Sequence, residues 1–357
     1  AAEVEDDGIP FEEKMAEQQD RSRASSKMQG DVFLDCHVDV KGLPKTTFLG
    51  YEQMKSAANI VKIFKNNQKV GEAKKGDSVT IVLDQTPFYA ESGGQIGDKG
   101  TITAGPAKVR VDDTQKDGDV VLHIGEVTDG TIKTGSSVEA EVDKKRRLDI
   151  MRNHTATHLL QAALRKVLGS HVQQQGSVVD DERLRFDFTH PAALKPAQIV
   201  AIEHFVYETV LACKPVVKEN LSLEEAKNQG ALAFFAEKYG STVRVVSIEG
   251  TSKELCGGTH LNCTGEIGLF KIISESAIAQ GIRRIEAKTG WGALDWMNSQ
   301  SEQLQELGRD LKVATADVPM RVTVLLNQKK QLEKLLVQER YEKLKGTLAA
   351  LVDSGKT

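Results

Sequence analysis

Aromatic residues, cysteines and long apolar runs are all scarce in this sequence. Aromatic side chains make up 5% of the 357 residues, so any core must be mainly aliphatic. The four cysteines (Cys36, Cys213, Cys256, Cys263) are too scattered for a secreted disulfide scaffold, which favours a reducing, cytoplasmic setting. No run approaches about 18 apolar residues and the N-terminus is acidic. We therefore expect neither a transmembrane helix nor a signal peptide, and no contact with a membrane.

Motifs for binding ATP or NAD are also missing. The chain has no Gly-x-Gly-x-x-Gly segment. It ends in Ser354-Gly355-Lys356-Thr357, which resembles the close of a P-loop, but Ala350 stands where the first glycine is required. The sequence therefore gives no support for ATP or NAD binding.

The charge balance argues mildly against a nucleic-acid binder. The net charge is −4, whereas phosphate contacts require a basic surface. Two local patches could supply one: Lys144-Lys145-Arg146-Arg147 and Arg283-Arg284. Each patch, taken alone, is equally compatible with an ordinary solvated face.

The pattern along the chain predicts an α+β fold in four parts. Residues 1–30 contain a predicted helix at 9–28, and the absence of an initiator Met predicts a fragment of a longer protein. Residues 31–145 carry short alternating runs between turn residues, typical of a small β-barrel or sandwich. Residues 146–290 begin with helical periodicity and then mix strand and helix. Residues 291–357 carry leucines at helical spacing in two runs, which predicts a helical hairpin or coiled coil.

The strongest chemical signal is a pair of motifs about 100 residues apart. His154 and His158 lie at i and i+4 in a predicted helix, so both imidazoles can face one ion. Cys256-Gly257-Gly258-Thr259-His260 adds a thiolate and a third imidazole around a glycine turn. One cysteine and three histidines suit tetrahedral Zn²⁺ better than Mg²⁺ or Ca²⁺.

The metal motifs leave two interpretations open and argue against a third. A closed set of four ligands is also the pattern of a purely structural zinc. A zinc peptidase would need a glutamate directly after the first histidine, and Thr155 stands there. A hydrolase of another kind needs an open coordination position, or a ligand that exchanges with water.

A second signal is the turn at Gly93-Gly94, followed by Gln95. Glycine permits positive φ and a close approach of the backbone to a ligand. Polar residues on both sides are consistent with a small-molecule pocket, although an ordinary glycine-rich hairpin has the same composition.

These segments resemble those of alanyl-tRNA synthetases. The stretch 86–98, the motif 153–160, the Cys256–His260 motif and the segment 281–287 occur in the same order and spacing in that family. The resemblance covers most of the chain. It implies that 1–30 is the last helix of a tRNA-recognition domain, and that 31–145 is the barrel of an editing domain. It further implies a zinc-binding editing core at 146–290 and the start of a C-terminal dimerisation region at 291–357, with no aminoacylation domain.

The resemblance also implies a function, namely hydrolysis of Ser-tRNA(Ala) and Gly-tRNA(Ala) by a zinc-dependent site. It places the metal ligands at His154, His158, Cys256 and His260, and the substrate-binding residues at Gly93, Gly94, Gln95 and Thr155. It suggests tRNA contacts at Arg283 and Arg284, and the helix-start lysines Lys144 and Lys145 are further candidates. The general base stays unassigned; a ribose hydroxyl of the substrate is one candidate.

Editing has an energetic rationale. A pocket for alanine rejects a ligand that differs by one methylene-sized group by only ~1–3 kcal/mol. A second, hydrolytic site can test for a feature that alanine lacks, and we hypothesise that Gln95 or Thr155 binds the serine hydroxyl. The rival interpretations are a free-standing editing protein of the same superfamily and a tRNA-binding module with structural zinc.

Overall fold

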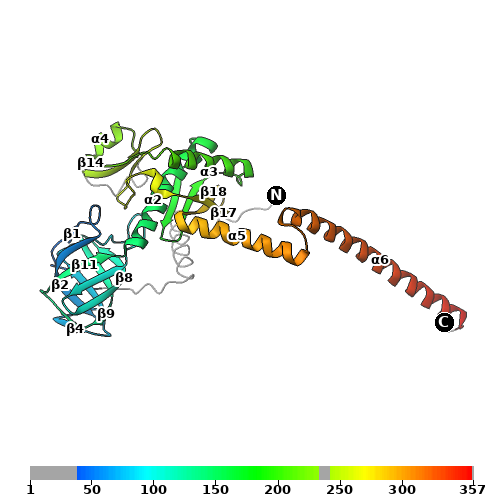
Figure 1. Ribbon diagram of the computed structural model, residues 1–357, viewed down its shortest axis with the longest axis horizontal. Helices are drawn as coiled ribbons and strands as arrows, with labels where there is room; N and C mark the ends of the chain where they lie inside the picture. Colours follow the sequence, from blue (N-terminus) through cyan, green and yellow to red (C-terminus); the bar gives the residue numbers. More distant parts are fainter. Residues whose placement is uncertain (1–37, 233–241, 356–357) are drawn as a thin grey trace, which may run out of the picture.

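A computed structural model describes residues 38–232 and 242–355 of the chain (Figure 1). The helix expected at 9–28 and Cys36 lie outside these residues. The predicted α+β class is confirmed, with a barrel, a mixed core and a helical C-terminal part in chain order. None of the described helices combines the length and apolar character needed to span a membrane.

Six long antiparallel strands close the predicted barrel. They are β2 (Lys55–Lys65), β5 (Ser78–Leu83), β7 (Gly100–Ala104), β8 (Ala107–Asp117), β9 (Val120–Asp129) and β11 (Ser137–Val142). The barrel closes because β11 pairs with both β7 and β2, with Ala140 opposite Ile102 on one side and Ser56 on the other. Alternate residues of β11 are buried, so apolar side chains fill the interior.

Short strands complete this region. They are β1 (Thr47–Phe48), β3 (Gln68–Val70), β4 (Glu72–Lys74), β6 (Gln85–Thr86) and β10 (Thr131–Lys133). β3 extends the barrel sheet beside β2, β4 pairs with β10, and β1 pairs with β6 in parallel. The short alternating runs that the sequence shows in this region therefore correspond to true strands.

Helices α2 (Lys144–Leu168) and α3 (Pro196–Leu211) share one core with a four-stranded sheet. The sheet order is β12 (Gln174–Val179), β13 (Leu184–Thr189), β18 (Ile282–Thr289) and β17 (Phe270–Ala279). Leu159 and Leu160 of α2 pack with Phe186 of β13 and Ile285 of β18. Helix α2 agrees with the helical periodicity predicted at the start of residues 146–290.

A smaller sheet carries the second metal motif. It consists of β14 (Val216–Ser222), β15 (Thr242–Ile248) and β16 (Ser252–Leu255), with α4 (Leu223–Asn228) packed against it and η2 (Thr264–Ile267) following the motif. β16 ends at Leu255, so Cys256 follows directly on an ordered strand.

The C-terminal part is helical, as predicted, but a hairpin is not shown. α5 (Gly290–Leu311) is followed by its C-cap residue Lys312, which adopts a left-handed conformation. The short helix η3 (Thr315–Asp317) then leads into α6 (Val318–Asp353). Figure 1 shows α6 extending away from α5 and from the rest of the protein. Most of the leucines that suggested a hairpin are solvent-exposed, including Leu332 and Leu344. Helical periodicity predicted the two helices but not how they are arranged relative to each other.

Candidate metal centre

Two histidines reach the site from one face of α2. The helix begins at Lys144 because the Asp143 side chain caps it, accepting a hydrogen bond from the Arg146 amide at 3.0 Å. His154 and His158 lie one turn apart, with their rings stacked at a centroid distance of 5.5 Å and an interplanar angle of 7°. Both are buried. The structure thus confirms that the i, i+4 spacing brings the two imidazoles together.

The loop that follows β16 supplies Cys256 and His260. Arg244 fixes this loop: its guanidinium donates hydrogen bonds to the carbonyl oxygens of Cys256 (3.1 Å) and Gly258 (2.9 Å). The Tyr51 hydroxyl donates to the carbonyl of Gly257 at 2.6 Å, tying the loop to the segment before β2. Glycine is required at 258, because a Cβ there would lie 2.0 Å from Cε1 of His154.

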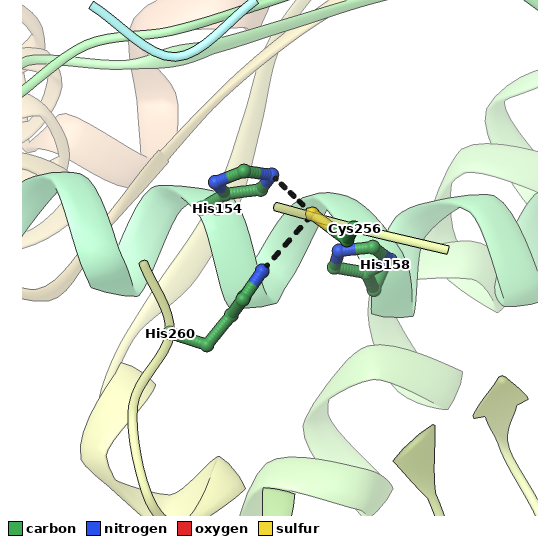
Figure 2. Close-up of side chains that lie close together, drawn as sticks. All are labelled: His154, His158, Cys256 and His260. Atoms are coloured by element: carbon green, nitrogen blue, oxygen red, sulfur yellow. Dashed lines mark hydrogen bonds between the residues drawn. The ribbon is translucent and has the colours of Figure 1, made fainter. Parts of the chain in front are cut away.

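The four candidate ligand atoms converge. They lie within 4.8 Å of one another, with Sγ of Cys256 3.4 Å from Nε2 of His154 and 3.2 Å from Nε2 of His260 (Figure 2). Nε2 of His158 is buried and has no hydrogen-bond partner among the described residues. A buried nitrogen without a partner is costly, whereas a metal ion would satisfy it. The donor set and this nitrogen therefore fit a metal ion.

Each imidazole is oriented from behind through its Nδ1 atom. Nδ1 of His154 lies 2.7 Å from Oε1 of Gln95, and Nδ1 of His158 lies 2.5 Å from Oε2 of Glu254. Nδ1 of His260 lies 3.3 Å from Oγ1 of Thr155. With Nδ1 engaged in each ring, all three Nε2 atoms are left to face the centre. Such outer hydrogen bonds fix the ring orientation of metal-binding histidines in general.

The electrostatics favour a thiolate at Cys256. Burial raises the pKa of the Cys256 thiol, but His154 and His260 outweigh burial and hold this pKa well below its usual range. Burial lowers the pKa of His158, but the Glu254 carboxylate outweighs it and raises that pKa to about 10. Burial holds the pKa of His260 well below its ordinary value. Thiolate and neutral imidazole are the forms that coordinate metals, so these shifts favour the coordinating forms of Cys256 and His260, whereas His158 must release a proton when a metal binds.

Gln95 and Thr155, predicted to bind substrate, are both fully buried beside the metal group. Besides its contact with His154, Oε1 of Gln95 accepts from the Thr259 amide at 2.9 Å, and Nε2 of Gln95 donates to Oγ1 of Thr259 at 2.9 Å. Oγ1 of Thr155 accepts from the Leu261 amide at 3.2 Å. In this structure the polar groups of both side chains are therefore bonded to the histidines and their loop.

Gly93 and Gly94 form the turn that delivers Gln95. Both have positive φ, +61° and +87°, and Ser92 and Gln95 bridge across the turn. A Cβ at Gly94 would lie 2.3 Å from the carbonyl oxygen of Ser177, so the turn packs directly against β12. A role of these glycines in substrate binding stays a prediction.

The predicted tRNA-contacting cations differ in their surroundings. Lys144 and Lys145 are exposed at the start of α2. Nε of Arg283 donates to Glu275 at 2.5 Å, and Nε of Arg284 donates to Asp187 at 2.7 Å, so both guanidinium groups already have a carboxylate partner. The structure does not test a tRNA contact for any of the four, which stays a prediction.

Half of the basic run at 144–147 serves the interior of the protein. Arg147 is 1% exposed; it pairs with Asp98 and donates to the carbonyls of Gly50 and Pro87, both at 2.8 Å. Arg146 forms an ion pair with Asp181 at 3.0 Å. The basic patch that the sequence suggested is therefore reduced to its two lysines.

Sequence reasoning missed several residues of the centre and the fate of Cys213 and Cys263. Glu254 sits two positions before Cys256 on β16, and a single carboxylate beside a metal motif was a usable signal. Cys263 is half-buried and forms a disulfide with Cys213. This bond joins the end of α3 to the start of η2. The rule against a disulfide scaffold does not exclude one isolated disulfide.

Two family models match the chain. The model described as "tRNA synthetases class II (A)" matches residues 2–146, and the model described as "Threonyl and Alanyl tRNA synthetase second additional domain" matches residues 243–286. The second range includes Cys256 and His260. Fold, metal group and matched segments together define the chain as part of an aminoacyl-tRNA synthetase.

Curated relatives specify which one. The chain is 47% identical over 348 residues to an alanine–tRNA ligase of Acetivibrio thermocellus, covering 97% of this chain and 39% of the relative. It is 46% identical over 332 residues to an alanine–tRNA ligase of Hydrogenovibrio crunogenus, covering 93% of this chain and 38% of that relative. The chain belongs to the alanine–tRNA ligase family, and it spans about two fifths of the length of these relatives.

Proposed function

We propose that this chain is a zinc-dependent editing hydrolase that removes serine or glycine wrongly esterified to tRNA(Ala). The observation that carries the proposal is the buried group His154, His158, Cys256 and His260, part of which lies in a segment shared by threonyl- and alanyl-tRNA synthetases. These four residues would hold the ion. Bound there, zinc would supply Lewis-acid polarisation of an ester carbonyl or of water.

Side chains around the candidate metal group hold its histidines in fixed orientations. Gln95, Glu254 and Thr155 each hold one histidine through Nδ1, so the three imidazoles need not reorganise when a ligand arrives. Glu254 is already bonded to His158 and to the Ser252 hydroxyl at 2.6 Å, which makes it a poor proton acceptor for the substrate. A ribose hydroxyl of the tRNA end remains our candidate acceptor, and removing either terminal hydroxyl in turn tests it.

The four protein donors also favour a second candidate, a structural zinc in a tRNA-binding segment. A complete tetrahedral set is characteristic of structural sites. Hydrolysis would require one donor to exchange with water or substrate. Cys256 is the only partly accessible member of the group among the described residues, so it is the donor nearest to solvent.

One assay separates the two candidates. Serine release from Ser-tRNA(Ala) is compared with alanine release from Ala-tRNA(Ala), for the wild type, Cys256→Ala and the exposed-histidine control His204→Ala, each with its zinc content. Selective serine release that Cys256→Ala alone loses, together with zinc, supports the hydrolase. A folded, zinc-loaded wild type that releases no serine refutes it and favours the structural role.

The proposal extends to the partners of the full-length protein. The exposed apolar residues of α6, such as Leu336 and Leu344, suit a helical partner, and we propose a homodimer contact in this region. Sedimentation of the chain with and without residues 318–357 tests this contact. An oligomeric state that is the same for both forms would contradict it.

A further inference from the structure

A narrow cleft reaches the metal group from the side of the barrel. Its lining includes Tyr51 from the segment before β2, Lys218 from β14, Arg244 from β15, and Thr259 and His260 from the metal-binding loop. His260 belongs to the candidate ligand set, so a molecule in this cleft would stand beside the metal centre.

The cleft wall contains two neighbouring cations that form no ion pair in the described part of the chain, although the Glu266 carboxylate acts on Lys218 from a longer distance. Strand pairing places Lys218 opposite Val246 and Arg244 opposite Asn220, so Lys218 and Arg244 are diagonal neighbours on one face of the sheet. Neither forms an ion pair within the described residues. Burial and the charge of Arg244 lower the pKa of Lys218. Two like charges side by side destabilise each other, and an anion seated between them would relieve this.

Both cations retain hydrogen-bonding capacity. Nζ of Lys218 donates to Oδ1 of Asn262 at 2.6 Å, which uses one of its three hydrogens. Nη1 of Arg244 donates to the loop carbonyls of Cys256 and Gly258, while Nε and Nη2 donate no hydrogen bond within the described residues. Glu52, an exposed residue, is the acidic member of the described lining and belongs to the opposite, barrel side.

Tyr51 adds an aromatic surface to the two charges. The guanidinium of Arg244 lies 4.1 Å from the centroid of the Tyr51 ring, and Phe48 meets this ring edge-on at 4.9 Å. Tyr51 nevertheless remains 47% exposed. An exposed aromatic ring beside cations is the combination with which proteins hold single-stranded nucleic acid, because the base stacks and the phosphate pairs.

We propose that Tyr51, Lys218 and Arg244 form the seat of the terminal nucleotide of a single-stranded RNA 3′ end. Lys218 and Arg244 hold its phosphate, and Tyr51 stacks on its base. The inference rests on the proposed function, since it puts the 3′ ester next to His260. It assigns RNA contacts to residues far in sequence from Lys144, Lys145, Arg283 and Arg284.

Binding of RNA without any ester tests the seat independently of hydrolysis. The probe is a short, fluorescently labelled single-stranded RNA that ends in adenosine, titrated by anisotropy at several salt concentrations. Lys218→Gln is compared with wild type and with Lys253→Gln, a lysine of β16 that bonds to Gln229 at 2.8 Å and does not line the cleft. Tyr51→Leu tests stacking, and zinc content and thermal unfolding confirm that each variant is intact.

The expected results are specific. Lys218→Gln should bind more weakly and make the log–log salt slope shallower by about 0.7, whereas Lys253→Gln should match wild type. Tyr51→Leu should weaken binding roughly 5- to 100-fold. Equal binding and slope in Lys218→Gln and wild type, or no RNA binding by the wild type, would overturn the seat. A chain that binds RNA in this way but releases no serine would keep the seat and discard the hydrolase.

Discussion

Oε1 of Gln95 lies 2.7 Å from Nδ1 of His154 and 2.9 Å from the backbone amide of Thr259. One buried oxygen thus connects a candidate ligand from α2 to the loop that carries two further candidate ligands. The glycine turn that precedes Gln95 belongs to the barrel region, so three separate chain segments meet at this side chain. Gln95 acts on the metal group as a positioning residue.

Replacing Gln95 should loosen the metal without unfolding the protein. Gln95→Met keeps the volume but removes both hydrogen bonds of the amide oxygen, and we expect zinc affinity to fall by about 10- to 100-fold in competition with a chelator. The matched control is Gln161→Met. Gln161 lies in α2 and is also buried, but its Nε2 has no hydrogen-bond partner in the described structure. Equal zinc affinity in both variants would contradict the positioning role.

The two glycines of the Cys256–His260 loop should respond differently to alanine. A Cβ at Gly258 would lie 2.0 Å from His154, whereas the nearest atom to a Cβ at Gly257 is the Tyr51 hydroxyl at 3.9 Å. Gly258→Ala should therefore lose bound metal, while Gly257→Ala should retain it. Metal content after dialysis and the absorption spectrum of the cobalt-substituted protein measure the difference.

His123 should make the barrel sensitive to acid. Its Nδ1–H donates to the Ile81 carbonyl at 3.0 Å and its Nε2 lies 2.7 Å from Oγ1 of Thr86, and burial lowers its pKa from 6.5 to about 4. Between these values the unfolded chain binds more protons than the folded one, so stability is complete above about pH 6.5 and falls as the pH drops. From pH 7.5 to 4.5 this loss amounts to roughly 2–3 kcal/mol.

The measurement is the free energy of unfolding by denaturant at several pH values. His123→Gln should be less stable at neutral pH but should show a smaller loss on acidification than wild type. His204→Gln, an exposed control on α3, should follow the wild type. The same pH slope in His123→Gln as in wild type would assign the acid sensitivity to other groups.

The buried pair of Arg147 and Asp98 should be needed for folding. Arg147→Ala leaves the buried Asp98 without its counter-charge and the Gly50 and Pro87 carbonyls without their side-chain donor, and we expect a loss of about 3–5 kcal/mol in the free energy of unfolding. Lys145→Ala, an exposed lysine two positions earlier, should change stability by no more than about 0.5 kcal/mol. A double variant that also replaces Asp98 by leucine should lose less than the sum of the two single variants.

Local periodicity predicted much of this structure. The barrel strands followed from alternation, and His154 with His158 followed from helical spacing. Arg147 also had a signal, since it precedes Ile150 and His154 by three and seven positions and so shares their buried face. The position of Gln95 could not be predicted from composition, because it depends on the long-range approach of the barrel turn to α2. The arrangement of α6 relative to α5 could not be predicted, because leucines at helical spacing do not specify which surface a helix packs against.

A single residue, Asp143, lies between the last barrel strand and α2, and it caps that helix. One turn later, Arg147 reaches back to carbonyls at Gly50 and Pro87, on the barrel side of the junction. The barrel and α2 are therefore rigidly connected, and His154 lies two turns further along the helix. An exchange of the barrel alone between related proteins would disrupt the helix cap and would remove the barrel-side partners of Arg147. We therefore expect the barrel and α2 to tolerate exchange only as one unit.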